Sequence, residues 1–300
     1  MMQEAPRFIA VDWGTTRLRA SLVGDHGSML ARTQSDLGVQ SVPAGGFAAA
    51  LGEACKPWFA AQPGLPVIMA GMVGSRNGWV EAPYLRCPCG PAEAGAALTE
   101  IAGLGRSVLL VPGVDHPSPD GTYDVMRGEE TQVFGAGVAD GMICLPGTHS
   151  KWVEMRGGRM VRFATFITGE LYAALSQSFV GRLATEPDDP RSGWGAAGRA
   201  ALSGGGLSRT LFQARTQVLN GSMPGAAVRP FLSRLLVDAE IDGAVALFGL
   251  PSRLHLVAAD PQRELYARAL VGHGFEVDMI DPETATLKGL EIVMAARARS

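Results

Sequence analysis

The sequence contains one short pattern twice, about half a chain apart. Each copy has an apolar run, a turn with Gly-Thr and a run in which apolar and polar residues alternate. The first spans Phe8 to Leu22 and the second spans Met142 to Met155. Alternation with a period of two is typical of strands. The pattern therefore predicts two similar β-hairpins, each with a strand on both sides of its glycine turn.

These turns differ from the usual glycine-rich phosphate loops. Rossmann and P-loop glycines lead from a strand into a helix, and the sequence has neither fingerprint. Strand-turn-strand loops rich in backbone N–H and hydroxyl groups suit a polyphosphate held between two related halves. Taken singly, each turn is equally well interpreted as an ordinary tight hairpin.

Composition narrows the class of partner. The 300 residues carry a net charge of −3, and their basic residues are scattered, so we expect a small-molecule partner rather than nucleic acid or a membrane. The Cys87-Pro88-Cys89 segment lacks zinc-site spacing, and we interpret the four cysteines as reduced thiols. No leader precedes Phe8 and no apolar run is long enough for a membrane span, so a cytoplasmic location is expected.

The pattern of elements predicts two α/β domains, at residues 1–140 and 141–300. In the first, we expect a helix from Phe47 to Phe59 and a buried strand, Val67 to Ala70, that opens into a glycine-punctuated loop. In the second, Glu186 to Gly195 is interpreted as a lid or an insertion. Asp260 and Asp281 each precede a proline, which predicts two helix N-caps.

Five segments are specific enough to indicate a family. They are Asp12 to Thr16, Gly71 to Trp79, Met126 to Gln132, Pro146 to Trp152 and Phe166 to Leu171. Together they resemble 2-dehydro-3-deoxygalactonokinase, and the resemblance covers nearly the whole chain. More distantly, the sequence is similar to the actin, Hsp70 and sugar kinase superfamily.

The resemblance implies a fold and a reaction. The fold is α/β, with two ribonuclease-H-like domains in the actin-like ATPase arrangement and a central cleft. The reaction is ATP- and Mg²⁺-dependent phosphorylation of 2-dehydro-3-deoxy-D-galactonate at its 6-hydroxyl. The expected partners are the sugar acid and ATP, and the sequence is compatible with a homodimer.

Two positions depart from the superfamily pattern. Pro146 stands where many members have an aspartate at the mouth of the second hairpin, so a second acidic group must come from elsewhere. The segment Val257 to Asp260 has alanines where adjacent glycines usually mark the adenosine side. This leaves room for a nucleoside but less for close backbone approach.

Phosphoryl transfer needs an aligned hydroxyl and donors that neutralise spreading negative charge. The two turns supply such donors, and His149 or Lys151 adds charge. The residues assigned to the nucleotide are Gly14, Thr15, Thr16, Gly147, Thr148, His149, Ser150, Lys151 and, on the adenosine side, Ala259.

Three acidic residues are the catalytic candidates. Asp12 follows a buried run, where a carboxylate can hold Mg²⁺ through water or accept the substrate proton. Glu129 and Glu130 stand at a predicted helix start, and only one of them is expected to face the cleft because consecutive helical positions diverge by about 100°. A turn cap for Asp12 and helix-dipole stabilisation for the glutamates are the alternatives.

The substrate's carboxylate calls for a guanidinium. Arg76 in the glycine loop is the first candidate and Arg127 the second. Aromatic side chains at Trp79 and Tyr84 could flank the carbon chain or serve as packing anchors. Ser75 and Glu170 complete the substrate assignment, with helix capping as the alternative for Glu170.

Two further functions stay open at this point. A polyphosphate or nucleotide phosphohydrolase is suggested by the Glu129-Glu130 pair, and a nucleotide-dependent sensor without catalysis by the superfamily resemblance. A gluconate-derived epimer is an alternative substrate.

Overall fold

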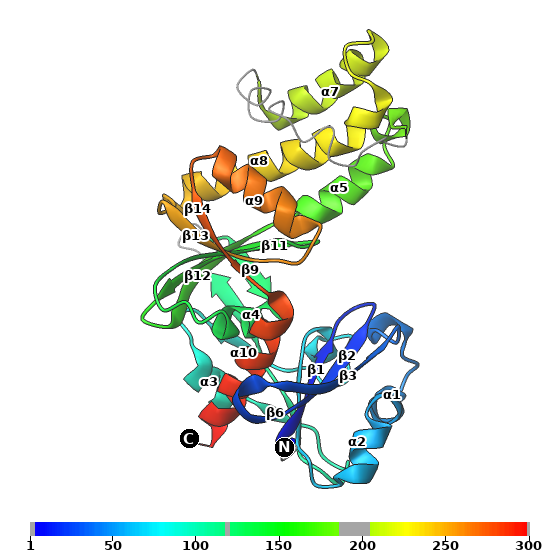
Figure 1. Cartoon of the computed structure of the whole chain (residues 1–300), viewed down its shortest axis with the longest axis vertical. Helices are drawn as coiled ribbons and strands as arrows, with labels where there is room; N and C mark the ends of the chain where they lie inside the picture. The colour runs from blue at the N-terminus through cyan, green and yellow to red at the C-terminus, as the bar shows by residue number, and fades with distance from the viewer. Residues whose placement is uncertain (1–3, 118–120, 186–204, 299–300) are drawn as a thin grey trace. The chain divides into compact units, whose positions relative to one another are not determined.

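The computed structural model describes residues 4–117, 121–185 and 205–298 (Figure 1). It divides into two compact units: unit 1 comprises Met1–Asp140, Val153–Phe163 and Ile280–Ser300, and unit 2 comprises Gly141–Trp152 and Ala164–Met279. This division differs from two contiguous domains, because two segments of the second half of the chain belong to unit 1. The segment 186–195, interpreted as a lid or an insertion, lies outside the described residues.

Unit 1 contains a six-stranded sheet with the order β3-β2-β1-β4-β7-β6. Its strands are β1 (Phe8–Trp13), β2 (Leu18–Val23), β3 (Met29–Ser35), β4 (Val67–Ala70), β6 (Thr99–Glu100) and β7 (Val108–Leu110). The first three form an antiparallel meander, and β4 pairs with β1 in parallel. Every residue of β4 is buried, as its continuous apolar run predicts.

A second, three-stranded sheet of unit 1 has no counterpart in the sequence prediction. It consists of β5 (Tyr84–Arg86), β8 (Gly113–Pro117) and β9 (Tyr123–Met126), in the order β5-β8-β9. The sequence from Pro112 to Gly121 is rich in proline and glycine, which favours a loop. Pairing with neighbouring strands overrides that local preference.

The helices of unit 1 also depart from the predictions in one place. The single helix expected from Phe47 to Phe59 is two helices, α1 (Phe47–Ala54) and α2 (Lys56–Ala61), because Pro57 begins a new first turn. The other helices are α3 (Pro91–Ala96), α4 (Glu129–Gly135) and α10 (Pro282–Arg297).

The C-terminal helix α10 belongs to unit 1 because glycines let it approach α4 closely. A Cβ at Gly135 would lie 1.8 Å from the carbonyl oxygen of Ala285, and one at Gly289 would lie 1.8 Å from that of Thr131. The helix starts as predicted, since the Asp281 carboxylate accepts a hydrogen bond from the Thr284 N–H at 2.8 Å.

Unit 2 is built on a five-stranded sheet with the order β12-β11-β10-β13-β14. Its strands are β10 (Gly141–Leu145), β11 (Ser150–Arg156), β12 (Arg159–Phe166), β13 (Arg253–Val257) and β14 (Glu276–Ile280). β13 pairs with β10 in parallel, as β4 pairs with β1 in the other sheet. The shared strand order confirms that the second half of the sequence repeats the plan of the first.

The described helices of unit 2 are α5 (Thr168–Ser176), α7 (Gly206–Leu219), α8 (Val228–Phe248) and α9 (Gln262–Gly272). The predicted N-cap at Asp260 is wrong, because α9 begins one residue later with Pro261 at its N-cap and no side-chain cap bond. The Asp260 carboxylate instead pairs with Arg263. Within the described residues, none of the helices combines the length and hydropathy that a bilayer crossing requires.

Candidate functional site

The first hairpin turn lies between β1 and β2. The N–H of Gly14 donates to the carbonyl oxygen of Arg17 at 2.9 Å and closes the turn. Among the described residues, no hydrogen bond occupies the N–H groups of Thr15 and Thr16. These two residues therefore provide the donors that the turn can offer to an anion.

A glycine outside the turn holds it in place. The carbonyl oxygens of Gly14 and Thr15 accept hydrogen bonds from the N–H groups of Val39 and Gln40, at 3.0 and 3.2 Å. A Cβ at Gly38 would lie only 2.2 Å from the carbonyl carbon of Thr16. Sequence reasoning missed Gly38, which no motif marks.

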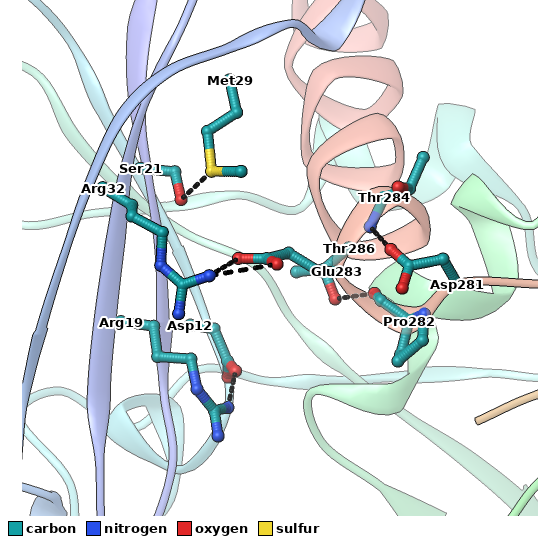
Figure 2. A network of polar contacts seen from close by, with 10 residues as sticks. All are labelled: Asp12, Arg19, Ser21, Met29, Arg32, Asp281, Pro282, Glu283, Thr284 and Thr286. Carbon is teal, nitrogen blue, oxygen red and sulfur yellow. Dashed lines mark hydrogen bonds and ion pairs between the residues drawn. The ribbon is translucent and has the colours of Figure 1, made fainter. Parts of the chain in front are cut away.

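Asp12 lies at the end of β1, opposite Arg19 of β2, and its side chain is 36% exposed. The Arg19 guanidinium donates to Oδ2 of Asp12 at 3.0 Å (Figure 2). Desolvation raises the pKa of the Asp12 carboxyl, and the charge and hydrogen bond of Arg19 oppose that rise. Asp12 is thus a partly exposed carboxylate with one oxygen engaged by a cation.

Figure 2 also shows that the start of α10 lies near this hairpin. Arg32 of β3 donates to both carboxylate oxygens of Glu283, at 3.1 and 3.3 Å. This exposed ion pair ties the C-terminal helix of unit 1 to the meander that carries Asp12.

Two glycines approach the end of β1 from other segments. Gly71 has φ of +98°, and a Cβ there would lie 2.9 Å from the carbonyl oxygen of Trp13 and 3.5 Å from Oδ1 of Asp12. Gly128 has φ of +113°, and its Cβ would lie 3.2 Å from the Cα of Gly71. The glycine loop and the segment before α4 therefore meet beside Asp12.

The adjacent glutamates of α4 have different environments. Glu130 is fully buried; one carboxyl oxygen accepts from the Gly128 N–H at 2.6 Å, and the other has no partner among the described residues. Burial, followed by the charge of Glu129, raises the pKa of Glu130 to about 8. Glu129 is partly exposed and accepts from the Arg127 N–H at 3.2 Å. Glu129 is therefore the more accessible of the two, and the prediction that one of them faces the cleft stays a prediction.

The predicted substrate residues lie in different surroundings. Arg76 is exposed, whereas the Ser75 hydroxyl is buried with no partner among the described residues. Trp79 stacks on Phe47 with ring centroids 6.0 Å apart. The structure thus places Trp79 against the core of unit 1, and its contact with substrate stays a prediction.

Arg127 is 8% exposed and packs over the ring of Tyr84, 4.2 Å from its centroid. Its guanidinium donates to the Ala82 carbonyl oxygen at 2.8 Å, and a Cβ at Gly74 would lie 3.0 Å from Nη1. Arg127 therefore supports the glycine loop from inside, and its role toward a substrate carboxylate stays a prediction.

The second hairpin turn, between β10 and β11, is held in a similar way. A Cβ at Gly169 would lie 2.4 Å from the Gly147 carbonyl oxygen, and the Glu170 N–H donates to the Thr148 carbonyl oxygen at 3.0 Å. Gly147 itself donates its N–H to the Ser150 hydroxyl at 3.4 Å. Gly169 therefore packs against the backbone of this turn, as Gly38 packs against that of the first turn.

The charged side chains of the second turn are partly engaged. The His149 imidazole lies 2.6 Å from the Glu170 carboxylate, and both are exposed. Lys151 is buried, and its ammonium donates to the His149 carbonyl oxygen at 3.4 Å. The assignment of these residues, and of buried Ser150, to phosphate contacts stays a prediction.

A cavity of about 410 Å³ lies in unit 2. Gly147 of the second turn lines it, with α5, α8 and α9. Its described lining comprises Gly147, Thr168, Gly169, Tyr172, Arg229, Pro230, Ser233, Leu236, Val237, Pro261, Gln262, Leu265 and Tyr266. Ala259 is exposed and lies two residues before Pro261, which belongs to the lining. Its assignment to the adenosine side stays a prediction.

Sequence reasoning missed the polar residues that α8 and α9 contribute to this cavity. Arg229 and Ser233 belong to α8, whose pattern gives no sign of a ligand. Gln262 and Tyr266 lie in the first turns of α9, shortly after the segment with alanines that ends at Asp260, so closeness in sequence to that segment was the available signal. Across residues 4–117, 121–185 and 205–298, no three His, Cys, Asp or Glu side chains are grouped to hold a metal ion.

The chain is similar to sugar-acid kinases over nearly its whole length. The family model described as 2-keto-3-deoxy-galactonokinase matches residues 12–293. The Escherichia coli (strain K12) 2-dehydro-3-deoxygalactonokinase is 34% identical over 97% of this chain and 99% of its own. A crystal structure of a candidate 2-dehydro-3-deoxygalactonokinase from Sinorhizobium meliloti is 33% identical, covers 97% of this chain and 99% of its own, and has a TM-score of 0.86.

A more distant structure shows the fold. The activator of 2-hydroxyisocaproyl-CoA dehydratase from Clostridium difficile, solved with ADPNP, is 11% identical, covers 97% of this chain and 96% of its own, and has a TM-score of 0.54. This likeness confirms the predicted actin-like ATPase fold.

Proposed function

The chain belongs to the 2-keto-3-deoxy-galactonokinase family and is a sugar-acid kinase, and from that premise we propose that it phosphorylates 2-dehydro-3-deoxy-D-galactonate at the 6-hydroxyl with ATP and Mg²⁺. The observation that carries the proposal for ATP is the continuity of one cavity with the second hairpin. Gly147 belongs to both, so a nucleoside in the cavity would extend its phosphates toward the turn.

The lining of the cavity suits a nucleoside. Leu236, Val237 and Leu265 provide apolar surface for a base, and Arg229, Ser233 and Gln262 provide polar groups for a ribose or base edge. Small-molecule sites combine apolar walls with a few polar groups in this way. The volume of about 410 Å³ is in the range of such sites.

Asp12 is proposed as the acidic group of the transfer. Its Oδ2 accepts a hydrogen bond from Arg19. Its Oδ1 lies beside Gly71, and because glycine has no Cβ, the space next to Oδ1 stays open. Mg²⁺ bound to a nucleotide typically uses one or two carboxylates, phosphate oxygens and water, so one carboxylate fits the ion. The ion would supply neutralising charge, while Asp12 holds its water shell or takes the substrate proton.

Unit 1 also provides the proposed substrate residues. Arg76 presents an exposed guanidinium on the glycine loop, which suits the carboxylate of the sugar acid. Tyr84 is exposed next to Arg127 and offers an aromatic edge for the carbon chain. Ser75 adds a hydroxyl in the same loop. In unit 2, Glu170 pairs with His149, and we assign it a secondary part in binding.

The experiment is a product assay with purified protein, ATP and Mg²⁺. We expect the 6-phosphate of 2-dehydro-3-deoxy-D-galactonate by mass spectrometry, with one ADP formed per phosphate transferred. The gluconate-derived epimer, tested in parallel, shows whether the site selects stereochemistry. Phosphate release without a sugar acid would contradict the proposal in favour of a phosphohydrolase. Nucleotide-dependent assembly without product would favour a sensor.

A further inference from the structure

Unit 2 contains a buried carboxylate that the reaction does not use directly. Glu240 of α8 is 2% exposed. It accepts hydrogen bonds from the Trp152 indole N–H at 2.8 Å and from the Tyr266 hydroxyl at 2.7 Å. Burial raises its pKa, and hydrogen bonds from Thr168, Tyr266, Trp152 and Ser150 oppose that rise. These partners are neutral donors.

The partners of Glu240 connect the cavity to the second hairpin. Tyr266 and Thr168 line the cavity, whereas Ser150 begins the strand that leaves the turn. The hydroxyl oxygens of Tyr266 and Ser150 are 3.0 Å apart and buried. Ser150 in turn accepts from the Gly147 N–H at 3.4 Å. A continuous path of hydrogen bonds therefore runs from Glu240 to the turn.

The proton positions along this path follow from chemistry. The Tyr266 hydroxyl gives its single proton to Glu240, whose carboxylate only accepts when it is ionised. The Ser150 hydroxyl also has one proton and lies within reach of both Glu240 and the Tyr266 oxygen; directed at Tyr266, 3.0 Å away, it leaves a lone pair of Ser150 for the Gly147 N–H. All bonds then point toward Glu240, and chains with one direction polarise each other.

We propose that Glu240, Tyr266 and Ser150 act as positioning residues that fix the second hairpin in the geometry that binds the nucleotide's phosphates. The inference rests on the proposed function, since it assumes that ATP or ADP occupies the cavity. In this account the aromatic ring of Tyr266 borders the nucleoside, while its hydroxyl acts on the turn. Ser150 serves the phosphates through the Gly147 backbone.

The test compares ADP with adenosine, because only ADP has phosphates. Binding of each ligand to the full-length wild type and to Tyr266→Phe is measured by calorimetry. We expect the variant to bind ADP about tenfold more weakly, the effect of one hydrogen bond, and adenosine within about twofold of the wild type. A merely structural role would weaken both ligands equally. Equal losses, or unchanged ADP binding, would overturn the proposal.

A matched control exists in unit 1. The Tyr123 hydroxyl donates to the buried Asp115 carboxylate at 2.7 Å, the same bond length as in the Tyr266 pair. Tyr123→Phe removes a hydroxyl-to-carboxylate bond of the same length from a more exposed tyrosine away from the cavity lining, so both affinities are expected to stay at the wild-type value. If Tyr123→Phe selectively weakens ADP binding, the effect of Tyr266→Phe is not specific and the proposal is wrong.

A second variant tests the path itself. Ser150→Ala removes the acceptor of the Gly147 N–H, and we expect the same selective loss of ADP affinity. The double variant should bind ADP no more weakly than either single variant, because one path is broken in each. Losses that multiply would contradict a common path. If Tyr266→Phe does not fold, Ser150→Ala decides alone, and unchanged ADP binding overturns the inference. A wild type that binds neither ligand contradicts the proposed function itself.

Discussion

The two glycine hairpins have similar backbones but different support. In each, a glycine from a later segment packs directly on the turn, Gly38 on the first and Gly169 on the second. That same segment donates two backbone N–H groups to carbonyl oxygens of the first turn and one to a carbonyl oxygen of the second. Backbone carbonyls engaged from outside leave N–H groups as the remaining polar face, which is the arrangement that binds anions.

The side chains beneath the hairpins differ. The first has a partly exposed carboxylate, Asp12, paired with an exposed arginine. The second has Pro146 at the corresponding mouth and a buried carboxylate, Glu240, joined to the turn through hydroxyls. We propose that one backbone device serves two purposes, with chemistry at the first turn and rigid nucleotide binding at the second.

The largest expected effect is that of Asp12→Asn. Removing the charge while keeping the shape should lower kcat by about a thousandfold, within the range of a lost acid-base or metal-binding group. Stability measured by thermal unfolding should change little. Asp36→Asn, an exposed aspartate of the neighbouring loop, is the control and should retain activity. An Asp12→Asn enzyme with wild-type kcat would place the chemistry elsewhere.

Glu130→Gln should change the pH dependence of stability. The folded-state pKa of Glu130 is about 8, above its ordinary value of 4.5. Between these values the folded protein holds a proton that the unfolded chain has released, so the unfolding free energy falls as pH rises, by up to about 1.4 kcal/mol per unit. The variant lacks this titration. Chemical denaturation at pH 5, 6, 7 and 8 measures the unfolding free energy of both proteins. As pH rises, the unfolding free energy of the variant should increase relative to that of the wild type. A difference between the two that does not change with pH would refute the buried protonated carboxyl.

Gly38→Ala and Gly169→Ala test whether both turns need their outer glycine. Each Cβ would meet backbone, at 2.2 and 2.4 Å, so the chain must shift. We expect each variant to lose about 1–3 kcal/mol of unfolding free energy. Gly64→Ala has nothing within 4 Å of its Cβ and is the control. If only one of the two variants were destabilised, the two hairpins would be similar in sequence but not in the way that an outer glycine supports them.

Arg19→Gln should have the smallest effect on stability, below about 1 kcal/mol, because its ion pair with Asp12 is exposed. It should still alter the pH profile. Arg19 lowers the pKa of Asp12, so its loss raises that pKa and moves the acid limb of kcat/KM to higher pH. A pH-rate series on wild type and variant measures this shift. An unmoved acid limb would show that Asp12 ionisation does not control the rate.

The sequence predicted much of the backbone plan. The alternating pattern around Gly14 and Gly147 predicted both hairpins, and the continuous apolar run of β4 predicted a buried strand. It did not reveal the small sheet of β5, β8 and β9, because its strands are short and β8 lies in the stretch rich in proline and glycine. Nor did it assign α10 to unit 1, since that depends on the close contact at Gly289.

Site residues were predictable where local motif and chemistry coincide. Asp12 is the penultimate residue of the first predicted strand, and its position needs no long-range information. The roles of Glu240, Tyr266 and Gly38 depend on partners distant in sequence; Ser150 and Tyr266, for example, are separated by 116 in residue number. A buried glutamate within a helix is an unusual signal, yet the sequence alone does not say what it bonds.

We propose that both turns respond to the phosphates of a bound nucleotide. Hydrogen-deuterium exchange of the full-length protein tests this most directly, with ATP and Mg²⁺ compared against adenosine. The account predicts that ATP, and not adenosine, protects the amides of Thr15 and Thr16 as well as those around Thr148. Protection of a single turn, or equal protection by adenosine, would contradict it.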